Sequence, residues 1–336
     1  MIITEYAYPR AGLIGNPSDG YFGKTISFIF DNFRAQVILY ETPELEIIPN
    51  TRDHTKFESL RHLLEDIRMF GYYGGIRLLK AAVKRFVEYC DNEGIQLPKK
   101  NFTIRYNTNI PTQVGLGGSS AIITAAIKAL MRFYEVKIQK PFLPNLILSV
   151  ETKELGISAG LQDRVAQVYG GVTYMDFNKE FFLKHNHGYY EKIPIHLLPK
   201  LYIAYRTELS ESSEVFHNNI KERFEKGDPE IINAMKFWAN LTDEVKKRLL
   251  AGKGDTIGEL LNANFDMRRK IYNISKGNIE MIELARSTGA SAKFCGSGGA
   301  IVGNYQDESM FQKLKKVFKD INVKVIKPHI IELKET

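Results

Sequence analysis

The sequence predicts an α+β fold built from two domains. A chain of 336 residues is long enough for about two domains with sizeable cores. Its first part mixes β-rich runs with amphipathic helical runs, and beyond residue 200 the order β, helices, β, β, α, β is a split βαβ arrangement. An irregular stretch over residues 178–199 separates these parts. We therefore expect one domain over residues 1–192 and a second over residues 193–336.

The first part is expected to contain at least three strands and one long helix. Residues 25–30 and 35–40 are β-rich runs separated by a short link that contains Asp31, Asn32 and Phe33, a spacing typical of a hairpin. From Gly75 apolar side chains recur at helical spacing, and Gly94 is expected to end that helix. Residues 102–106 then alternate as a strand before a loop rich in Pro and Gly.

The second part supplies the remaining elements of the split βαβ arrangement. Three helical stretches follow a predicted first strand at residues 201–205. We then expect strands at residues 291–295 and 300–304, a helix near 309–319 and a strand at 323–327.

Composition and charge exclude several classes of function. Lys and Arg number 46 against 39 Asp and Glu, a net charge of +7, but the lysines alternate with acidic residues as on a solvated helix face. Two cysteines form neither a disulfide framework nor a four-thiolate zinc site, and no apolar run is long enough to span a bilayer. No secretory signal is recognisable at the start. We expect a soluble cytoplasmic protein with no nucleic-acid or membrane partner.

Residues 10–19 form the first of three glycine-containing segments. Alone, this segment is equally well explained as a strand ending in an Asn-Pro turn. Residues 18–25 come close to a P-loop, but a P-loop must open a helix, and residues 26–30 have the pattern of a strand. We therefore reject a P-loop here.

The second segment, Pro111 to Ala121, predicts an anion site. It follows a strand and precedes an apolar helical pattern, so its glycines allow close backbone approach and the helix start supplies N–H donors. Ser119 or Ser120 either caps this helix, the commoner role for an isolated serine, or places a hydroxyl on a metal ion. A nucleophile elbow is not supported, because no histidine occurs in a convincing partner context.

The third segment and an acidic pair complete the pattern. Residues 293–300 contain four consecutive small residues between predicted strands, which form either a simple turn or a loop whose backbone packs on the second segment. Glu151, expected on a helix, and Asp163, in a turn before a helix, stand beside small residues rather than in a charge run. Surface carboxylates are the common alternative, but this setting favours a site.

Together these motifs resemble those of the GHMP small-molecule kinases, named after the galactokinase, homoserine, mevalonate and phosphomevalonate kinases. The three segments occur in the family's order from Arg10 to Gly299, and Pro-x-x-x-Gly-Leu-Gly followed by serines before a helix is distinctive. The resemblance implies a two-domain fold with a ribosomal protein S5 domain 2-like N-terminal domain and a ferredoxin-like C-terminal domain.

Within the family, four stretches are most similar to the plant-type glucuronokinase group, which phosphorylates D-glucuronate at its anomeric oxygen: residues 15–19, 72–75, 160–171 and 264–269. Asn16 and Pro17 stand where galactokinase-type motifs carry Glu and His, which argues against galactose. Gly118 replaces the first serine of the usual motif and leaves the metal serine in place.

The resemblance also assigns roles residue by residue. Asp163 matches the residue that orients or deprotonates the acceptor hydroxyl, and Arg10 the basic residue near the transferring phosphoryl group. Ser119 and Glu151 match the ligands of Mg²⁺. The expected contacts of ATP are Pro111, Gly115, Leu116, Gly117, Gly118, Ser119, Ser120, Gly296, Ser297 and Gly298, and those of the substrate are Asn16, Asp19, Asp163 and Arg164.

The resulting expectation is an ATP-dependent sugar-acid 1-kinase that converts D-glucuronate to its 1-phosphate. The alternatives are a kinase for galacturonate, a galactose-type sugar or a small alcohol, and a catalytically silent sugar-binding homologue. The pocket for a uronate carboxylate should offer a cation or several amides. Arg164, Lys24, Arg268 and Arg269 are the candidate cations, each also explicable as an ordinary ion pair. Tyr72 and Tyr73 are candidates for an adenine pocket, with a core role as the simpler explanation.

Overall fold

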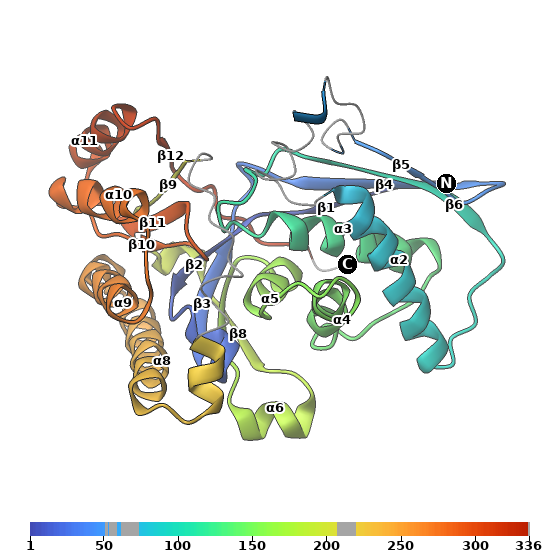
Figure 1. Cartoon of the computed structure of the whole chain (residues 1–336), viewed down its shortest axis with the longest axis horizontal. Coiled ribbons are helices and arrows are strands. Elements are labelled where there is room, and N and C mark those ends of the chain that lie inside the picture. Colours follow the sequence, from blue (N-terminus) through green and yellow to red (C-terminus); the bar gives the residue numbers. More distant parts are fainter. Residues whose placement is uncertain (51–52, 54–58, 62–73, 207–219, 335–336) are drawn as a thin grey trace. The chain divides into compact units, whose positions relative to one another are not determined.

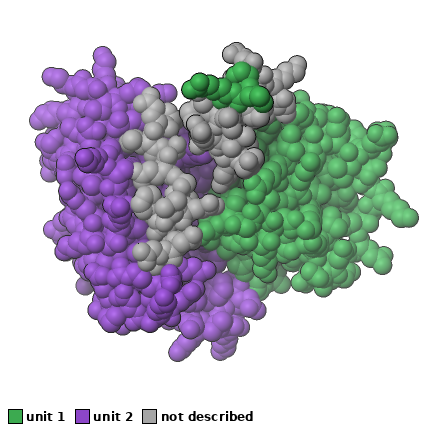
Figure 2. Space-filling view, in the orientation of Figure 1, with its two compact units in different colours: residues 1–7, 34–109, 119–159 green, residues 8–33, 110–118, 160–336 purple. Residues whose placement is uncertain are grey.

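A computed structural model describes residues 1–50, 53, 59–61, 74–206 and 220–334 (Figure 1). The chain divides into two compact units, each assembled from several segments (Figure 2). Unit 1 comprises residues 1–7, 34–109 and 119–159, and unit 2 comprises residues 8–33, 110–118 and 160–336. Unit 2 has residues on both sides of the domain boundary expected between residues 192 and 193, and that boundary stays a prediction.

Unit 1 is a four-stranded sheet with helices. The strand order is β1 (Ile2–Ala7), β4 (Ala35–Thr42), β6 (Asn101–Thr108), β5 (Glu46–Ile48), antiparallel except for the parallel pair β5 and β6. Its helices include α2 (Gly75–Asn92), α3 (Gly118–Phe133, in this unit from Ser119) and α4 (Leu143–Ser149).

The predicted helix from Gly75 is confirmed as α2. It ends where expected, because Gly94 has a φ of +68° and the amide of Ile95 donates to the carbonyl of Cys90 at 2.8 Å. This left-handed glycine closes the last turn.

The first sheet of unit 2 holds the first glycine-containing segment. Its antiparallel order is β2 (Arg10–Ile14), β3 (Lys24–Ile29), β7 (Val172–Asp176), β8 (Tyr189–Ile193), accompanied by α5 (Gln162–Tyr169) and α6 (Lys179–His185). Because β3 is a strand, the rejection of a P-loop is confirmed.

The hairpin expected from residues 25–40 is wrong, since β3 and β4 belong to different sheets. Beyond β3 the chain pairs with the C-terminal segment instead. Phe30 forms a β-bridge with Ile330, and the amide of Asp31 donates to the carbonyl of His329 at 2.9 Å. The short link between β3 and β4 would suit a hairpin, but its backbone groups are hydrogen-bonded to the distant C-terminal segment instead.

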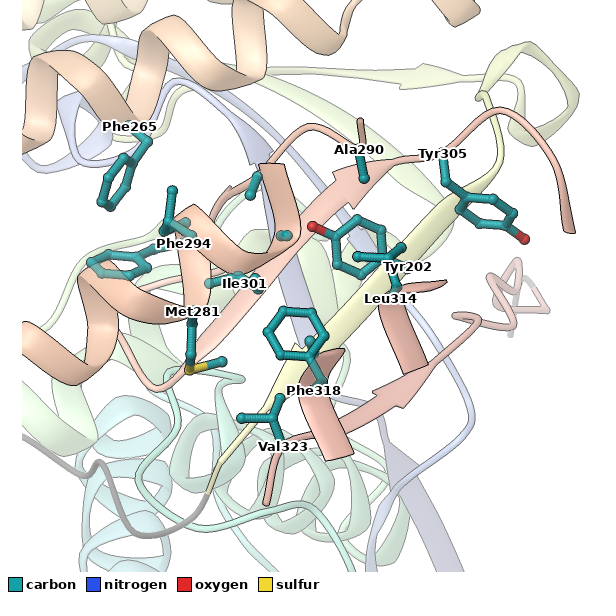
Figure 3. Close-up of a cluster of buried hydrophobic side chains, with 14 of the residues drawn as sticks. Tyr202, Phe265, Met281, Ala290, Phe294, Ile301, Tyr305, Leu314, Phe318 and Val323 are labelled. Atoms are coloured by element: carbon teal, nitrogen blue, oxygen red, sulfur yellow. The ribbon is translucent and has the colours of Figure 1, made fainter. Parts of the chain in front are cut away.

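The second sheet of unit 2 confirms the ferredoxin-like expectation. The order β10 (Lys293–Phe294), β11 (Ala300–Asn304), β9 (Leu201–Tyr205), β12 (Lys324–Ile326) is antiparallel, so each βαβ pair has a third strand between its two strands. The helices are α8 (Pro229–Leu250), α9 (Gly258–Ile271), α10 (Lys276–Ser287) and α11 (Glu308–Lys319). Figure 3 shows the core that α9, α10 and α11 form with this sheet, built around buried side chains such as Tyr202, Phe265, Met281 and Phe318.

None of the helices within the described ranges has the length and apolar character needed to cross a bilayer.

Candidate active site

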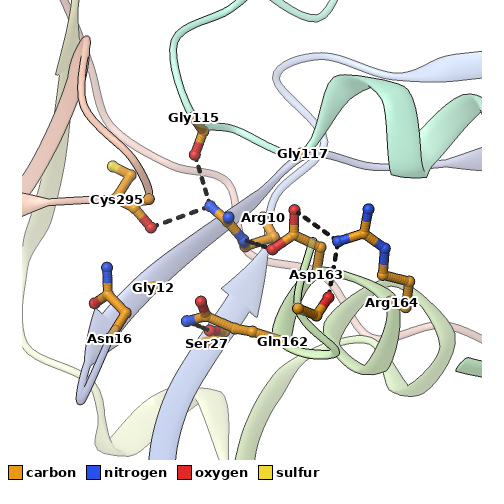
Figure 4. A network of polar contacts seen from close by, with 12 residues as sticks. Arg10, Gly12, Asn16, Ser27, Gly115, Gly117, Gln162, Asp163, Arg164 and Cys295 are labelled. Carbon is orange, nitrogen blue, oxygen red and sulfur yellow. Dashed lines mark hydrogen bonds and ion pairs between the residues drawn. The ribbon is translucent and has the colours of Figure 1, made fainter. Parts of the chain in front are cut away.

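Arg10 is the centre of a polar network in unit 2. It begins β2 and is 6% exposed. Its Nε donates to Oδ1 of Asp163 at 2.6 Å, and its Nη1 donates to the carbonyls of Gly115 at 2.6 Å and Cys295 at 3.0 Å (Figure 4). The Arg10 side chain thus joins all three glycine-containing segments to Asp163, the predicted catalytic residue.

The second and third glycine-containing segments pack backbone against backbone, as one of the two sequence interpretations expects. A Cβ on Gly296 would lie 2.4 Å from the carbonyl oxygen of Gly115, and a Cβ on Gly115 would lie 2.9 Å from the amide nitrogen of Ser297. Gly115 also has a φ of +69°. The amide of Arg10 donates to the carbonyl of Leu116 at 3.0 Å. Only glycine permits the close backbone contact between Gly115 and Gly296.

Asp163 lies in the first turn of α5, whose start is held by buried polar contacts. The Nε2 of Gln162 donates to the hydroxyls of Thr25 at 2.9 Å and Ser27 at 2.7 Å. The Nη1 of Arg164 lies 3.5 Å from Oδ2 of Asp163 and donates to the carbonyl of Gly160 at 2.8 Å. The carboxylate of Asp163 therefore lies beside two guanidinium groups, those of Arg10 and Arg164.

Asp19 brings a second carboxyl group to the same network. It lies in the 3-10 turn η1 (Ser18–Tyr21), where a Cβ on Gly160 would be 3.1 Å from its Oδ2. Burial, and then the charge of Asp163, raise the pKa of Asp19 to about 6, although the charges of Arg10 and Arg268 oppose this shift. Asp19 therefore titrates near neutral pH.

The raised pKa of Asp19 predicts a pH-dependent effect of Asp19→Asn on stability. Between about pH 4 and pH 6, Asp19 binds more protons in the folded protein than in the unfolded chain. The free energy of unfolding therefore decreases as pH rises through this range. The cost to stability is complete above the folded pKa of about 6. That cost is at most about 3 kcal/mol. We expect the variant to gain more stability over the wild type in urea at pH 7.5 than at pH 4.5. An equal gain in stability at both pH values would contradict the raised pKa of Asp19.

A buried lysine that sequence reasoning did not single out holds the first segment in place. Lys293 is 1% exposed, and its Nζ donates to Gly12 O at 2.6 Å, Asn16 Oδ1 at 2.6 Å and Phe294 O at 2.7 Å. Desolvation lowers its pKa to about 7. Asn264 also contacts the carbonyl of Asn16, through its Nδ2 at 3.0 Å. A lysine in an otherwise apolar and small-residue run was the available signal.

These contacts bear on the predicted substrate residue Asn16. It is 3% exposed, and its carboxamide oxygen accepts from Lys293. Its contact with a sugar stays a prediction, as do those of Asp19 and Arg164.

The predicted magnesium ligands are adjacent within unit 1. The Oγ of Ser119 donates to Oε1 of Glu151 at 2.7 Å. Ser119 is in the first turn of α3, and Glu151 lies in the π-helical turn η2 (Val150–Glu154), where it is 2% exposed. A hydroxyl and a carboxylate are oxygen ligands of the kind Mg²⁺ prefers, with waters and phosphates completing its shell. The pair therefore fits the ion.

Neighbouring residues of the predicted ATP site have the expected local structure. Helix α3 begins at Gly118, Gly117 has a φ of +72°, and Ser119 follows directly in the chain. Leu116 and Ser120 are buried, at 1% and 0% exposure, so they anchor the segment from inside. In the described part of the chain, no group of three or more His, Cys, Asp or Glu is placed so that it could hold a metal ion.

Tyr72 and Tyr73, the predicted adenine candidates, lie outside the described residues.

Comparisons with known proteins bear on the family and the fold of the chain. Residues 77–171 match the GHMP kinases N terminal domain. Glucuronokinase 1 of Arabidopsis thaliana is 47% identical over 306 residues, which cover 89% of this chain and 84% of that protein. A mevalonate kinase of Methanocaldococcus jannaschii is 25% identical over 312 residues, covering 90% and 93%. The structure of Lactococcus lactis galactokinase complexed with galactose has a TM-score of 0.74 at 17% identity, covering 98% and 94%, and shares the fold.

Proposed function

The chain belongs to the GHMP kinase family, and we propose that it is an ATP-dependent sugar-acid 1-kinase that phosphorylates D-glucuronate. Two relatives from Arabidopsis thaliana support this proposal: Glucuronokinase 1, which is 47% identical to the chain, and Probable glucuronokinase 2, which is 48% identical. Family membership makes it a phosphotransferase with an alcohol group as acceptor. The observation that carries the proposal is the ion pair of Arg10 and Asp163, anchored on the carbonyls of Gly115 and Cys295.

Asp163 is the base in the proposed reaction. Its carboxylate accepts the proton of the anomeric hydroxyl, which is more acidic than an ordinary alcohol and therefore suits a carboxylate base. Arg10 holds that carboxylate in one orientation and places positive charge where the phosphoryl group gains negative charge. Phosphoryl transfer requires such positioning and charge neutralisation more than covalent chemistry.

ATP would lie with its phosphates over the glycine loop and the start of α3, where backbone N–H groups favour anions. Mg²⁺, held by Ser119 and Glu151, would supply neutralisation of the phosphate charge. A cytoplasmic location stays a prediction from composition.

An ADP-release assay over a panel of sugars tests the proposal. We expect release with D-glucuronate, little with galacturonate, glucose or galactose, and a 1-phosphate product by ³¹P NMR. Release with a neutral sugar or galacturonate alone would assign another acceptor. Glucuronate binding without release by the metal-loaded protein would identify a silent homologue.

Glu151→Gln is expected to raise the Mg²⁺ concentration for half-maximal activity by about tenfold or more, because a neutral amide is a weaker ligand. A magnesium titration at saturating ATP measures this shift. Glu154→Gln is a suitable control, since Glu154 lies in the same turn and binds the half-exposed Lys84. An unchanged magnesium requirement in Glu151→Gln would remove Glu151 from the metal site.

A further inference from the structure

The four cations considered for the substrate carboxylate differ in their partners. Three of them already have a carboxylate: Lys24 pairs with Asp243 at 2.7 Å, Arg164 with Asp163 at 3.5 Å, and Arg269 with Glu283 at 2.9 Å. In each of these pairs a carboxylate of the protein already compensates the positive charge. The pair of Arg269 with Glu283 is also half-exposed on the surface.

Arg268 makes no ion pair with any described residue, although it is only 5% exposed. Its Nη1 donates to the carbonyl of Gly296 at 2.8 Å and its Nη2 to that of Ser297 at 3.3 Å. Its guanidinium lies 5.2 Å from the ring centre of Tyr272 and 5.1 Å from that of Phe294. A buried charge whose hydrogen bonds go only to neutral carbonyls is costly, so a directly bound anionic partner would stabilise it.

Gly296 connects Arg268 to the catalytic pair. Its carbonyl accepts from Arg268, and a Cβ on the same residue would lie 2.9 Å from Nη1 of Arg10. The charge of Arg268 also lowers the pKa of Asp19, so the two charged groups lie near each other. Arg268 therefore lies beside Arg10 and the third glycine-containing segment, and near Asp19, which is expected to contact the sugar.

The chemistry of the side chain suits a carboxylate. A guanidinium has five N–H donors in a planar fork, and the two bonds to the glycine-loop carbonyls leave donors for a second partner. Lys293, the other buried cation without a carboxylate partner among the described residues, has given all three of its N–H donors to Gly12, Asn16 and Phe294. Of these two buried cations, Arg268 is thus the one that combines a positive charge without a carboxylate partner with N–H donors that can bind a ligand.

We propose that Arg268 binds the carboxylate of the sugar acid and determines the preference for a uronic acid over a neutral sugar. This inference rests on the proposed function, because it names the carboxylate-binding residue of that same site.

The test compares D-glucuronate with D-glucuronamide, which replaces the carboxylate by a neutral amide of similar shape. We expect wild-type kcat/KM to favour glucuronate, and Arg268→Gln to reduce this preference by about 10- to 100-fold, the range for losing a hydrogen bond to a charged group. Arg268→Lys should retain part of the preference. Arg269→Gln, next in sequence and on the surface, is the matched control and should leave it unchanged.

Further measurements separate the outcomes. Thermal unfolding and the KM for ATP report whether Arg268→Gln has only disturbed the glycine loop. Equal wild-type kcat/KM for glucuronate and glucuronamide would overturn the inference even if the variant did not fold. A preserved preference in Arg268→Gln, or its loss in Arg164→Gln alone, would also overturn it. Absence of ADP release with every uronic acid in the wild type would instead reject the proposed function.

Discussion

Replacing Asp163 with asparagine is expected to lower kcat by about 10²- to 10⁴-fold, the range for removing a general base, with little change in the KM for ATP. Asparagine keeps an oxygen that accepts from Nε of Arg10 but cannot take a proton from the sugar hydroxyl. The loss should therefore appear in the chemical step. Steady-state kinetics with both substrates varied, together with single-turnover measurements, would locate it there.

Two controls make the result of Asp163→Asn specific. Thermal unfolding shows whether loss of the negative charge between Arg10 and Arg164 has weakened the fold. Asp266→Asn removes a half-exposed carboxylate paired with Arg286 and should retain normal turnover. Near-normal turnover in Asp163→Asn would show that another group accepts the proton.

The glycine segments and the acids could be predicted because their chemistry is local. Glycines before a helix indicate close backbone approach wherever they occur, and the helix after Leu116 and the strands around residues 293–300 follow from short-range patterns. The contact of Ser119 with Glu151 was expected only from family resemblance, since the two residues are 32 positions apart.

Local patterns failed where distant segments compete for the same groups. The hairpin at residues 25–40 was expected from its short link, but the backbone beyond β3 pairs with residues near 330. For a related reason, Lys293 was not singled out from the sequence, and Arg268 could not be distinguished from the three other candidate cations. A buried cation is recognised by what surrounds it, and the carbonyls and rings around these two come from segments up to 281 positions away.

Gly296→Ala is expected to reduce kcat/KM for ATP by about 10²-fold, the cost of displacing a reacting group by roughly 1 Å. The new methyl group would lie 2.4 Å from the carbonyl oxygen of Gly115 and 2.9 Å from Nη1 of Arg10, so the two glycine loops must separate. Since Arg10 donates to the carbonyls on both sides of this contact, the ion pair with Asp163 would shift with them.

The measurement for Gly296→Ala is initial velocity over a range of ATP concentrations, with glucuronate saturating. Gly20→Ala is the matched control, because that glycine is exposed and no atom lies within 4 Å of its added Cβ. If Gly296→Ala unfolds at the wild-type temperature and keeps its ATP kinetics, the backbone contact between the loops is not needed to shape the nucleotide site. If the loss is instead confined to ATP while glucuronate binding persists, the loop contact supports the phosphates specifically, as its position beside Gly115 requires.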